Sequence, residues 1–202
     1  MRQTTIIFIL SIFTTLASAQ STESFESRIE SFSSQNRTIQ CDFVQTKKVK
    51  GVKNIIISRG EFFYDNSGLM ALIYNEPEGD KVVINGEKFK VVTSGKIIEG
   101  ASEDNPMMEQ ICGMLQASMS GDVAELGRGW QMRVADHPTQ YEVVLQPLDR
   151  RTKKYIESLV MLFRKSDMTL DELRMNDSSD GYTLYEFQNK RTNGVIDPIK
   201  FE

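Results

Sequence analysis

Residues 81–93 read KVVINGEKFKVVT, and this stretch predicts a β-hairpin. The runs Lys81 to Ile84 and Glu87 to Thr93 are rich in strand-forming residues and flank Asn85-Gly86. A two-residue hairpin turn needs positive φ at both central positions, which Asn and Gly accept more readily than other residues. The sequence therefore predicts that neighbouring strands pair in antiparallel fashion here.

Runs with strand character continue on both sides of this hairpin. Alternating apolar residues begin at Ile39, and further strands are predicted at Ile55 to Tyr64, Leu69 to Tyr74, Lys96 to Glu99, Trp130 to Ala135, Tyr141 to Gln146, Tyr155 to Lys165, Leu170 to Asn176 and Tyr182 to Gln188, with a bend at Arg59-Gly60. The short turns leave no room for crossover helices, so a parallel sheet is disfavoured. About ten strands with two clear helices predict an α+β fold, mainly β, with a strongly curved antiparallel sheet closed partly like a barrel and helices over its opening.

The two predicted helices are amphipathic. Thr22 to Gln35 places Phe25, Ile29 and Phe32 on one face. Asn105 to Met119 has an apolar side rich in methionine, formed by Met107, Met108, Ile111, Cys112, Leu115 and Met119. Methionine adapts to changing apolar shapes, so this helix is predicted to be a movable cover, with ordinary core packing as the alternative.

The first nineteen residues have the features of a signal peptide. Arg2 precedes an apolar run from Ile6 to Leu16, and Ala17-Ser18-Ala19 forms a small-residue cleavage pattern. We expect cleavage after Ala19, export, and a single domain over residues 20–202. An uncleaved membrane tether is the alternative reading. No cysteine follows the cleavage site, so we expect no lipid anchor on the protein itself.

The charge balance disfavours nucleic acid as a partner. Without the first nineteen residues the chain has 23 Lys and Arg residues against 28 Asp and Glu residues. The basic pairs Lys47-Lys48, Arg150-Arg151 and Lys153-Lys154 lie at or near turn signals, where solvated charge is the ordinary explanation. We assign these pairs no function from sequence.

Few residues are arranged for catalysis. His137 is the only histidine and lies in a predicted loop, Glu103-Asp104 and Asp171-Glu172 flank turns, and no Gly-x-Ser-x-Gly elbow is present. Cys41 and Cys112 are the only cysteines, and the sequence leaves open whether they pair. Nothing in the spacing indicates a metal or a cofactor. We therefore expect a binding protein and no enzyme, and keep a small hydrolase as a minor alternative.

Several strings resemble the LolA family of periplasmic lipoprotein carriers, in the same order and with similar spacing. They are Glu26-Ser27-Arg28-Ile29, Asp42-Phe43-Val44-Gln45-Thr46-Lys47, Gly60-Glu61-Phe62, Tyr74-Asn75-Glu76-Pro77, Val83-Ile84-Asn85-Gly86, Tyr141 to Pro147, and Asn193-Gly194-Val195-Ile196-Asp197 with Lys200-Phe201. The resemblance covers nearly the whole chain after residue 19. It implies an unclosed β-barrel whose concave apolar face is covered by helices and holds the acyl chains of a client lipoprotein.

The resemblance also implies location and partners. These are the periplasm, acylated lipoproteins, an inner-membrane complex that releases them and an outer-membrane acceptor, with the carrier itself a monomer. One departure concerns the lid. Asn66-Ser67 stands where the family commonly has Arg-Pro, and that arginine helps to hold the lid closed. Asn66 is therefore a candidate for a different latch, and a carrier or sensor for another envelope lipid or glycolipid remains an alternative function.

The candidate ligand-lining residues come from the strands and the methionine-rich helix. They are Phe43, Phe62, Met70 and Leu72 on strands, and Met107, Met108, Ile111, Leu115 and Met119 on the lid. Phe25, Ile29 and Phe32 form a candidate second cover. A one-residue error in strand parity would replace some of these with Phe63 or Leu69, and filling of an ordinary core is the alternative role for the whole set.

Overall fold

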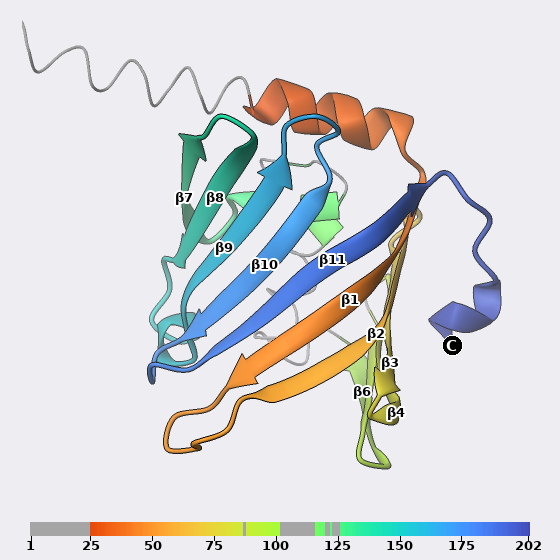
Figure 1. Cartoon of the computed structure of the whole chain (residues 1–202), viewed down its shortest axis with the longest axis vertical. Helices are drawn as coiled ribbons and strands as arrows, with labels where there is room; N and C mark the ends of the chain where they lie inside the picture. Colours follow the sequence, from red (N-terminus) through yellow and green to blue (C-terminus); the bar gives the residue numbers. More distant parts are fainter. Residues whose placement is uncertain (1–24, 87, 102–115, 120–121, 123–125) are drawn as a thin grey trace, which may run out of the picture.

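The computed structural model of the chain describes residues 25–86, 88–101, 116–119, 122 and 126–202. Eleven strands form one sheet (Figure 1). They are β1 (Thr38–Lys48), β2 (Ile56–Asp65), β3 (Leu69–Glu76), β4 (Glu78–Asn85), β5 (Lys88–Thr93), β6 (Lys96–Ala101), β7 (Trp130–Asp136), β8 (Gln140–Pro147), β9 (Ile156–Arg164), β10 (Leu170–Asp177) and β11 (Tyr182–Thr192). Two short 3-10 helices, η2 (Thr152–Lys154) and η3 (Pro198–Phe201), accompany them.

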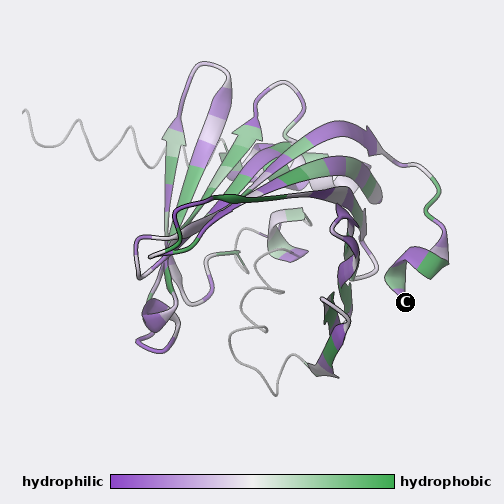
Figure 2. Cartoon of the chain, turned by 60° about the horizontal axis from the view of Figure 1, so that its bottom comes forward, coloured by the Kyte–Doolittle hydropathy of each residue, from purple (hydrophilic) through white to green (hydrophobic). Residues whose placement is uncertain are grey.

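Each strand pairs antiparallel with its neighbours, in the order β6-β5-β4-β3-β2-β1-β11-β10-β9-β8-β7. Strands β1 to β6 and strands β7 to β11 are therefore each paired in sequence order, and the first strand, β1, joins the last, β11, at the centre. β6 and β7 form the two ends of the order, so the sheet stays open. Figure 2 shows the β1–β6 side bending steeply away from the β7–β11 side. The predicted antiparallel, mainly β architecture is confirmed.

The β4–β5 hairpin is present, with its turn one residue later than the sequence predicts. Asn85 pairs with Lys88 and Ile84 pairs with Phe89, so the turn begins after Asn85. Gly86 supplies the positive φ of 59°. The observed register is favoured because it sets two apolar side chains, Ile84 and Phe89, opposite each other on one face, whereas the predicted register sets Ile84 opposite a glutamate.

Gly60 marks the bend predicted in β2. The pairing of β2 with β3 shifts register between Arg59 and Gly60. A Cβ atom at Gly60 would lie 2.1 Å from the Ile73 carbonyl oxygen and 2.8 Å from the Phe43 ring. Only glycine therefore lets the backbone of β3 and the ring of Phe43 approach this strand so closely.

The sheet has a large apolar core on its concave face and a small one on its outer face. The concave-face cluster takes residues from strands on both sides of the sheet, together with Phe25, Ile29, Ala117, Met119 and Leu126. The outer cluster consists of Phe63, Ala71, Val83 and Phe201, with Phe201 coming from η3. Alternation along the strands sends successive side chains to these two clusters.

Residues 25–35 are helical, in agreement with the predicted first helix from Phe25 onward. The Phe25 ring lies 5.5 Å from the Tyr141 ring and 5.2 Å from the Phe163 ring, so the helix packs against β8 and β9. Residues 116–119 are also helical, whereas most of the predicted methionine-rich helix lies outside the described residues. No described helix is both long enough and apolar enough to cross a membrane.

Candidate ligand-binding face

The four strand residues predicted to line a ligand site lie on the same face of the sheet. Phe43, Phe62, Met70 and Leu72 are all buried in the concave-face cluster. Cross-strand pairing joins Cys41 to Phe62 and Phe62 to Leu72. The alternative residues Phe63 and Leu69 belong to the outer cluster. The structure therefore selects the predicted strand parity for the concave face.

The predicted helical residues are described only in part. Met119 is buried in the concave-face cluster beside the strand residues, as are Phe25 and Ile29, and Phe32 is partly buried against it. Met107, Met108, Ile111, Leu115 and Cys112 lie outside the described residues.

Burial on the concave face falls toward the β6 edge. One cross-strand row runs from Leu72 through Val82 and Val91 to Ile98, each pairing with the next. Leu72 is 8% exposed, Val82 and Val91 are half-buried, and Ile98 is 57% exposed. We call these four residues the open row. It is an apolar surface that no described segment fully covers.

On the other side of the sheet the corresponding positions are filled. Val143 pairs with Met161, and Leu145 pairs with Leu159. All four side chains are at most 1% exposed. The rings of Tyr141 and Phe163 next to them are held under Phe25. This side of the concave face is a packed core, with no surface left for a ligand.

A small cavity lies between these two regions. Its volume is about 20 Å³, and its lining includes Phe32, Cys41, Phe62, Met119 and Phe187. Such a volume holds about one water molecule. An acyl chain therefore enters the interior only if residues of the lining move.

Residues 116–119 join the two sides of the concave face through two hydrogen bonds. Gln116 Nε2 donates to the Gly68 carbonyl oxygen in the β2–β3 turn at 3.2 Å. Ser118 Oγ donates to Met161 Sδ on β9, also at 3.2 Å. The predicted latch residue Asn66 lies exposed in the same turn, where its backbone N–H donates to the Arg37 carbonyl. The side chain of Gln116, which the sequence did not single out, is therefore bonded to the turn that contains Asn66.

An aromatic and polar cluster lies where the two regions meet. The Phe43 ring contacts the Tyr74 ring at 5.0 Å and the Tyr185 ring at 5.8 Å. Gln45 Nε2 donates to Tyr185 Oη at 2.6 Å, and the Tyr74 and Tyr185 hydroxyls are 3.3 Å apart. Burial raises the pKa of both tyrosines well above the usual value. These hydroxyls therefore stay neutral and serve as fixed hydrogen-bonding groups.

One charged group borders the small cavity. Lys190, whose side chain is 10% exposed, forms an ion pair with Asp171, and Asp171 also accepts from Arg164 Nη2 at 2.7 Å. Cys41 beside it is a free thiol, and burial raises its pKa to about 12. The thiol is therefore unreactive at neutral pH. The cavity is apolar except for this lysine and a few hydroxyl groups.

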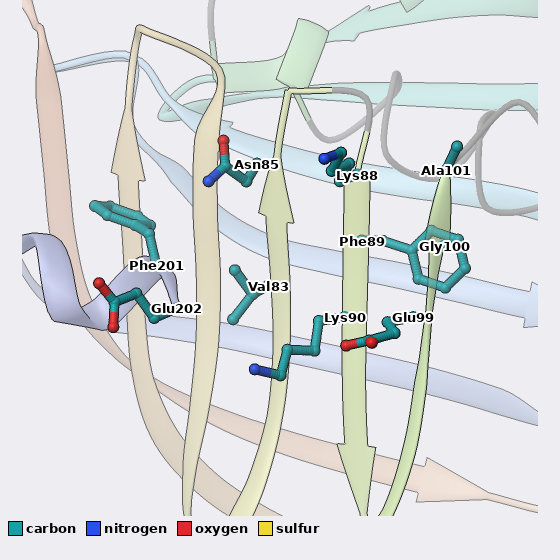
Figure 3. Close-up of a pocket in the computed structure, with 10 residues that line it drawn as sticks. All are labelled: Val83, Asn85, Lys88, Phe89, Lys90, Glu99, Gly100, Ala101, Phe201 and Glu202. Carbon is teal, nitrogen blue, oxygen red and sulfur yellow. The ribbon is translucent and has the colours of Figure 1, made fainter.

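A larger pocket lies on the outer face. It has a volume of about 580 Å³ and is lined by residues that include Val83, Lys88, Lys90, Glu99 and Phe201 (Figure 3). Val83 belongs to the outer cluster and pairs with Lys90. This pocket is therefore separated from the concave face by the sheet and is no part of the predicted ligand site.

The residues considered for catalysis are dispersed. His137 lies exposed in the β7–β8 turn, where its backbone N–H donates to the Gln140 carbonyl. Asp171 is held by Lys190 and Arg164, while Glu172 faces Glu186 across the strands. Within the described ranges, no three or more His, Cys, Asp and Glu side chains are grouped to hold a metal ion. Glu103 and Asp104 lie outside those ranges.

Comparison with known proteins agrees with this geometry. The sequence model of the family described as "Outer membrane lipoprotein carrier protein LolA" matches residues 34–202. No curated protein matches the chain.

Solved structures share the fold at low sequence identity. A conserved protein from Thermus thermophilus is 9% identical with a TM-score of 0.53, and the match covers 91% of this chain and 94% of that one. A DUF1329 family protein from Desulfovibrio piger is 9% identical with a TM-score of 0.51, covering 92% and 97%. MucB, in the Pseudomonas aeruginosa MucA/MucB complex, is 10% identical with a TM-score of 0.51, covering 89% of this chain and 59% of that one.

Proposed function

Because the chain belongs to the LolA family, we propose that it is a carrier that binds the acyl chains of lipoproteins on its concave face and takes them toward the outer membrane. The observation that carries this proposal is the open row, an apolar surface on the inside of a curved sheet. A core that served stability alone would cover Ile98 as completely as it covers Val143.

The binding energy available from such a surface is sufficient. Each methylene group removed from water contributes about 0.8 kcal/mol, so covering eight of them contributes about 6 kcal/mol before the costs of ordering. One acyl chain laid along the open row and into the space behind residues 116–119 therefore provides useful affinity. No covalent chemistry is needed.

Loading requires the small interior cavity to enlarge. In our proposal the helices act as covers, and residues 116–119 move away from the sheet when a chain enters. The two hydrogen bonds from Gln116 and Ser118 contribute only about 1 kcal/mol each, so the energy needed to break them is modest. Met70 and Met119 can then repack around either a chain or one another. Weak closure of this kind allows release as well as capture.

The setting of this cycle is also part of the proposal. The first nineteen residues act as a signal peptide that is cleaved after Ala19, and the mature protein is a monomer in the periplasm. It receives acylated lipoproteins from an inner-membrane release complex and delivers them to an outer-membrane acceptor.

A carrier or sensor for another envelope amphiphile is the second candidate. The observation that favours it is Lys190, a largely buried cation beside the small cavity. A ligand with an anionic head group would compete with Asp171 for this lysine. The acyl chains of a lipoprotein carry no charge, so they offer Lys190 no ionic partner.

Native mass spectrometry of the processed protein tests the proposal. We expect a one-to-one complex with an acylated lipoprotein peptide and none with the same peptide lacking acyl chains. The bound ligand should be recovered at unchanged mass, which distinguishes a carrier from a hydrolase. A complex with the unacylated peptide of equal abundance would contradict the proposal, and a complex with anionic lipids only would favour the second candidate.

A further inference from the structure

Three connections lie together at the end of the molecule away from helix 25–35, at the lower left of Figure 1. They are residues 47–57, which comprise the β1–β2 turn and the strand ends beside it, residues 148–155 between β8 and β9, and residues 177–181, which comprise the β10–β11 turn and the last residue of β10. We call these three segments the basic tip. Lys50 Nζ lies 3.8 Å from the Asp180 carboxylate, and Ser178 Oγ donates to the Lys154 carbonyl at 2.5 Å, so the segments contact one another.

The β1–β2 connection is built to project side chains into solvent. Its residues 46–58 read TKKVKGVKNIIIS, with four lysines and no acidic residue. A tight turn forms its apex, where Val52 N–H donates to the Val49 carbonyl at 3.1 Å and Gly51 takes a φ of 79°. Val49, Val52 and the three isoleucines 55–57 are all exposed.

Exposed apolar side chains are concentrated at this end. Eleven large apolar residues are exposed in the described part of the chain, and seven of them belong to the basic tip. Besides the five aliphatic residues of the β1–β2 connection, they are Leu148 and Tyr155. Single exposed apolar residues are ordinary, but a group of this size indicates a contact surface.

The charge of the tip is opposite to that of the whole chain. The three segments contain eight Lys and Arg residues and three Asp residues, whereas the chain as a whole has a net charge of −4. Two of the aspartates accept hydrogen bonds within their own turns. Asp149 accepts from the Arg151 and Thr152 N–H groups, and Asp177 accepts from the Ser179 and Gly181 N–H groups. The third, Asp180, is the partner of Lys50. Within these three segments the cations therefore outnumber the carboxylates that could neutralise them.

We propose that the basic tip docks on the surface of an anionic phospholipid bilayer. Aliphatic side chains next to lysines suit this surface, because the apolar groups enter the boundary between head groups and acyl chains while the lysines stay at the anionic head groups. The tip is convex, made of three turns at the ends of strands. A flat, deformable membrane accommodates such a shape without a matching groove, which a protein partner would have to supply.

Docking in this way leaves the concave face free. The tip is made of the β1–β2, β8–β9 and β10–β11 turns with the strand ends beside them, whereas the open row lies on β3, β4, β5 and β6. The proposal is therefore independent of the proposed cargo, and its test uses protein without ligand. Failure of membrane docking would leave acyl-chain binding standing, and the reverse also holds.

Vesicle sedimentation tests the proposal on the processed, purified protein. The vesicles are phosphatidylcholine alone, or phosphatidylcholine with one third phosphatidylglycerol, at low and high NaCl. We expect partition to the anionic vesicles only, weakened by salt. The K48Q/K53Q variant should bind about twenty-five-fold more weakly, because each lysine near an anionic surface contributes about five-fold. The V52S/I55S variant should also lose affinity, and its loss should persist at high salt.

The matched control is K88Q/K90Q. It removes two lysines from the outer face of β5, which is not part of the tip, and should change partition less than two-fold. Circular dichroism verifies that each variant is folded. Three results would overturn the proposal: equal partition to both kinds of vesicle, equal losses in K48Q/K53Q and K88Q/K90Q, or no partition at all by a protein that instead binds an acidic protein through the tip.

Discussion

The two sides of the concave face differ in how completely they are filled. On β8 and β9, the side chains of Val143, Leu145, Leu159 and Met161 are fully enclosed, and the rings of Tyr141 and Phe163 beside them pack against Phe25. Between β3 and β6, the open row loses cover step by step until Ile98 is mostly exposed. Both regions are apolar and both face the inside of the same curve.

The difference separates stability from binding. The filled side resembles any protein core, so its side chains stabilise the fold and leave no surface for a ligand. The open row stabilises the fold less, because its side chains retain contact with water. An apolar surface left in that state is available to hydrocarbon from another molecule. We therefore expect substitutions on the filled side to reduce stability and those on the open row to reduce binding.

The largest effect on stability is expected from Phe25→Ala, which removes a ring from the core of the filled side. Phe25 is fully buried between the Tyr141 and Phe163 rings, so its truncation should lower the free energy of unfolding by about 3–5 kcal/mol. Chemical denaturation measures this. Val195→Ala, at an exposed position, is the control. A loss below about 1 kcal/mol at Phe25 would mean that the helix is not a fixed part of the core, and the comparison would fail.

The junction between the two sides should respond to alkaline pH. Burial raises the pKa of Tyr74 and Tyr185, so the native phenols stay protonated while those of the unfolded chain ionise above about pH 10. Stability is therefore complete below pH 10 and falls above it, by up to about 1.4 kcal/mol per pH unit for each tyrosine. Denaturation of wild type and Y74F/Y185F between pH 8 and 11 measures the slope. An unchanged slope in the variant would show that these hydroxyls are accessible to water.

The contact across the opening is expected to be weaker. Gln116→Ala removes the hydrogen bond to the Gly68 carbonyl and should cost about 1 kcal/mol of stability or less. The same change should speed the uptake of an acyl probe, since one restraint on residues 116–119 is lost. Asn66→Ala, in the same turn, is the matched control and should leave the uptake rate alone. A reversed pattern in stopped-flow measurements would identify Asn66 as the latch.

The smallest effect concerns the outer surface of the filled side, and it is stabilising. Partial burial, then the carboxylates of Glu186 and Asp171, raise the pKa of Glu172. A raised acid pKa costs stability as pH rises through it, and the cost is absent when the group is protonated. After allowance for screening by water, Glu172→Gln should gain about 0.5 kcal/mol at pH 7 and nothing below pH 4. A gain in stability that persisted at pH 3 would show that its cause is not the charge of Glu172.

The strands were the most predictable part of the fold. Runs of β-branched residues between turn signals located all eleven strands to within a few residues, because these signals are local. The register of the β4–β5 hairpin was one residue off, since Asn85-Gly86 indicates a turn but cannot say which two residues form its centre. The register is set by the pairing of Ile84 with Phe89, and that pairing depends on burial in the folded sheet.

The sequence predicted which apolar residues gather on the concave face, and the described candidates, including Met119, lie there together. Alternation grouped Phe62 with Leu72, but the choice between this face and that of Phe63 needed the folded sheet. The uneven filling of the two sides could not be seen in the sequence, because Val143 and Val91 are equally apolar. Gln116 and Lys190 were missed because a single polar residue in an apolar segment carries no motif.

Two neighbouring isoleucines on β6 give the most direct test of the central claim. Ile97 and Ile98 are 61% and 57% exposed, yet only Ile98 lies on the concave face, in the open row. Ile97→Ser and Ile98→Ser therefore remove the same group at the same exposure from opposite faces. The dissociation constant for a fluorescent sixteen-carbon fatty acid should rise about tenfold for Ile98→Ser and less than two-fold for Ile97→Ser. Equal effects in the two variants would contradict binding on the concave face.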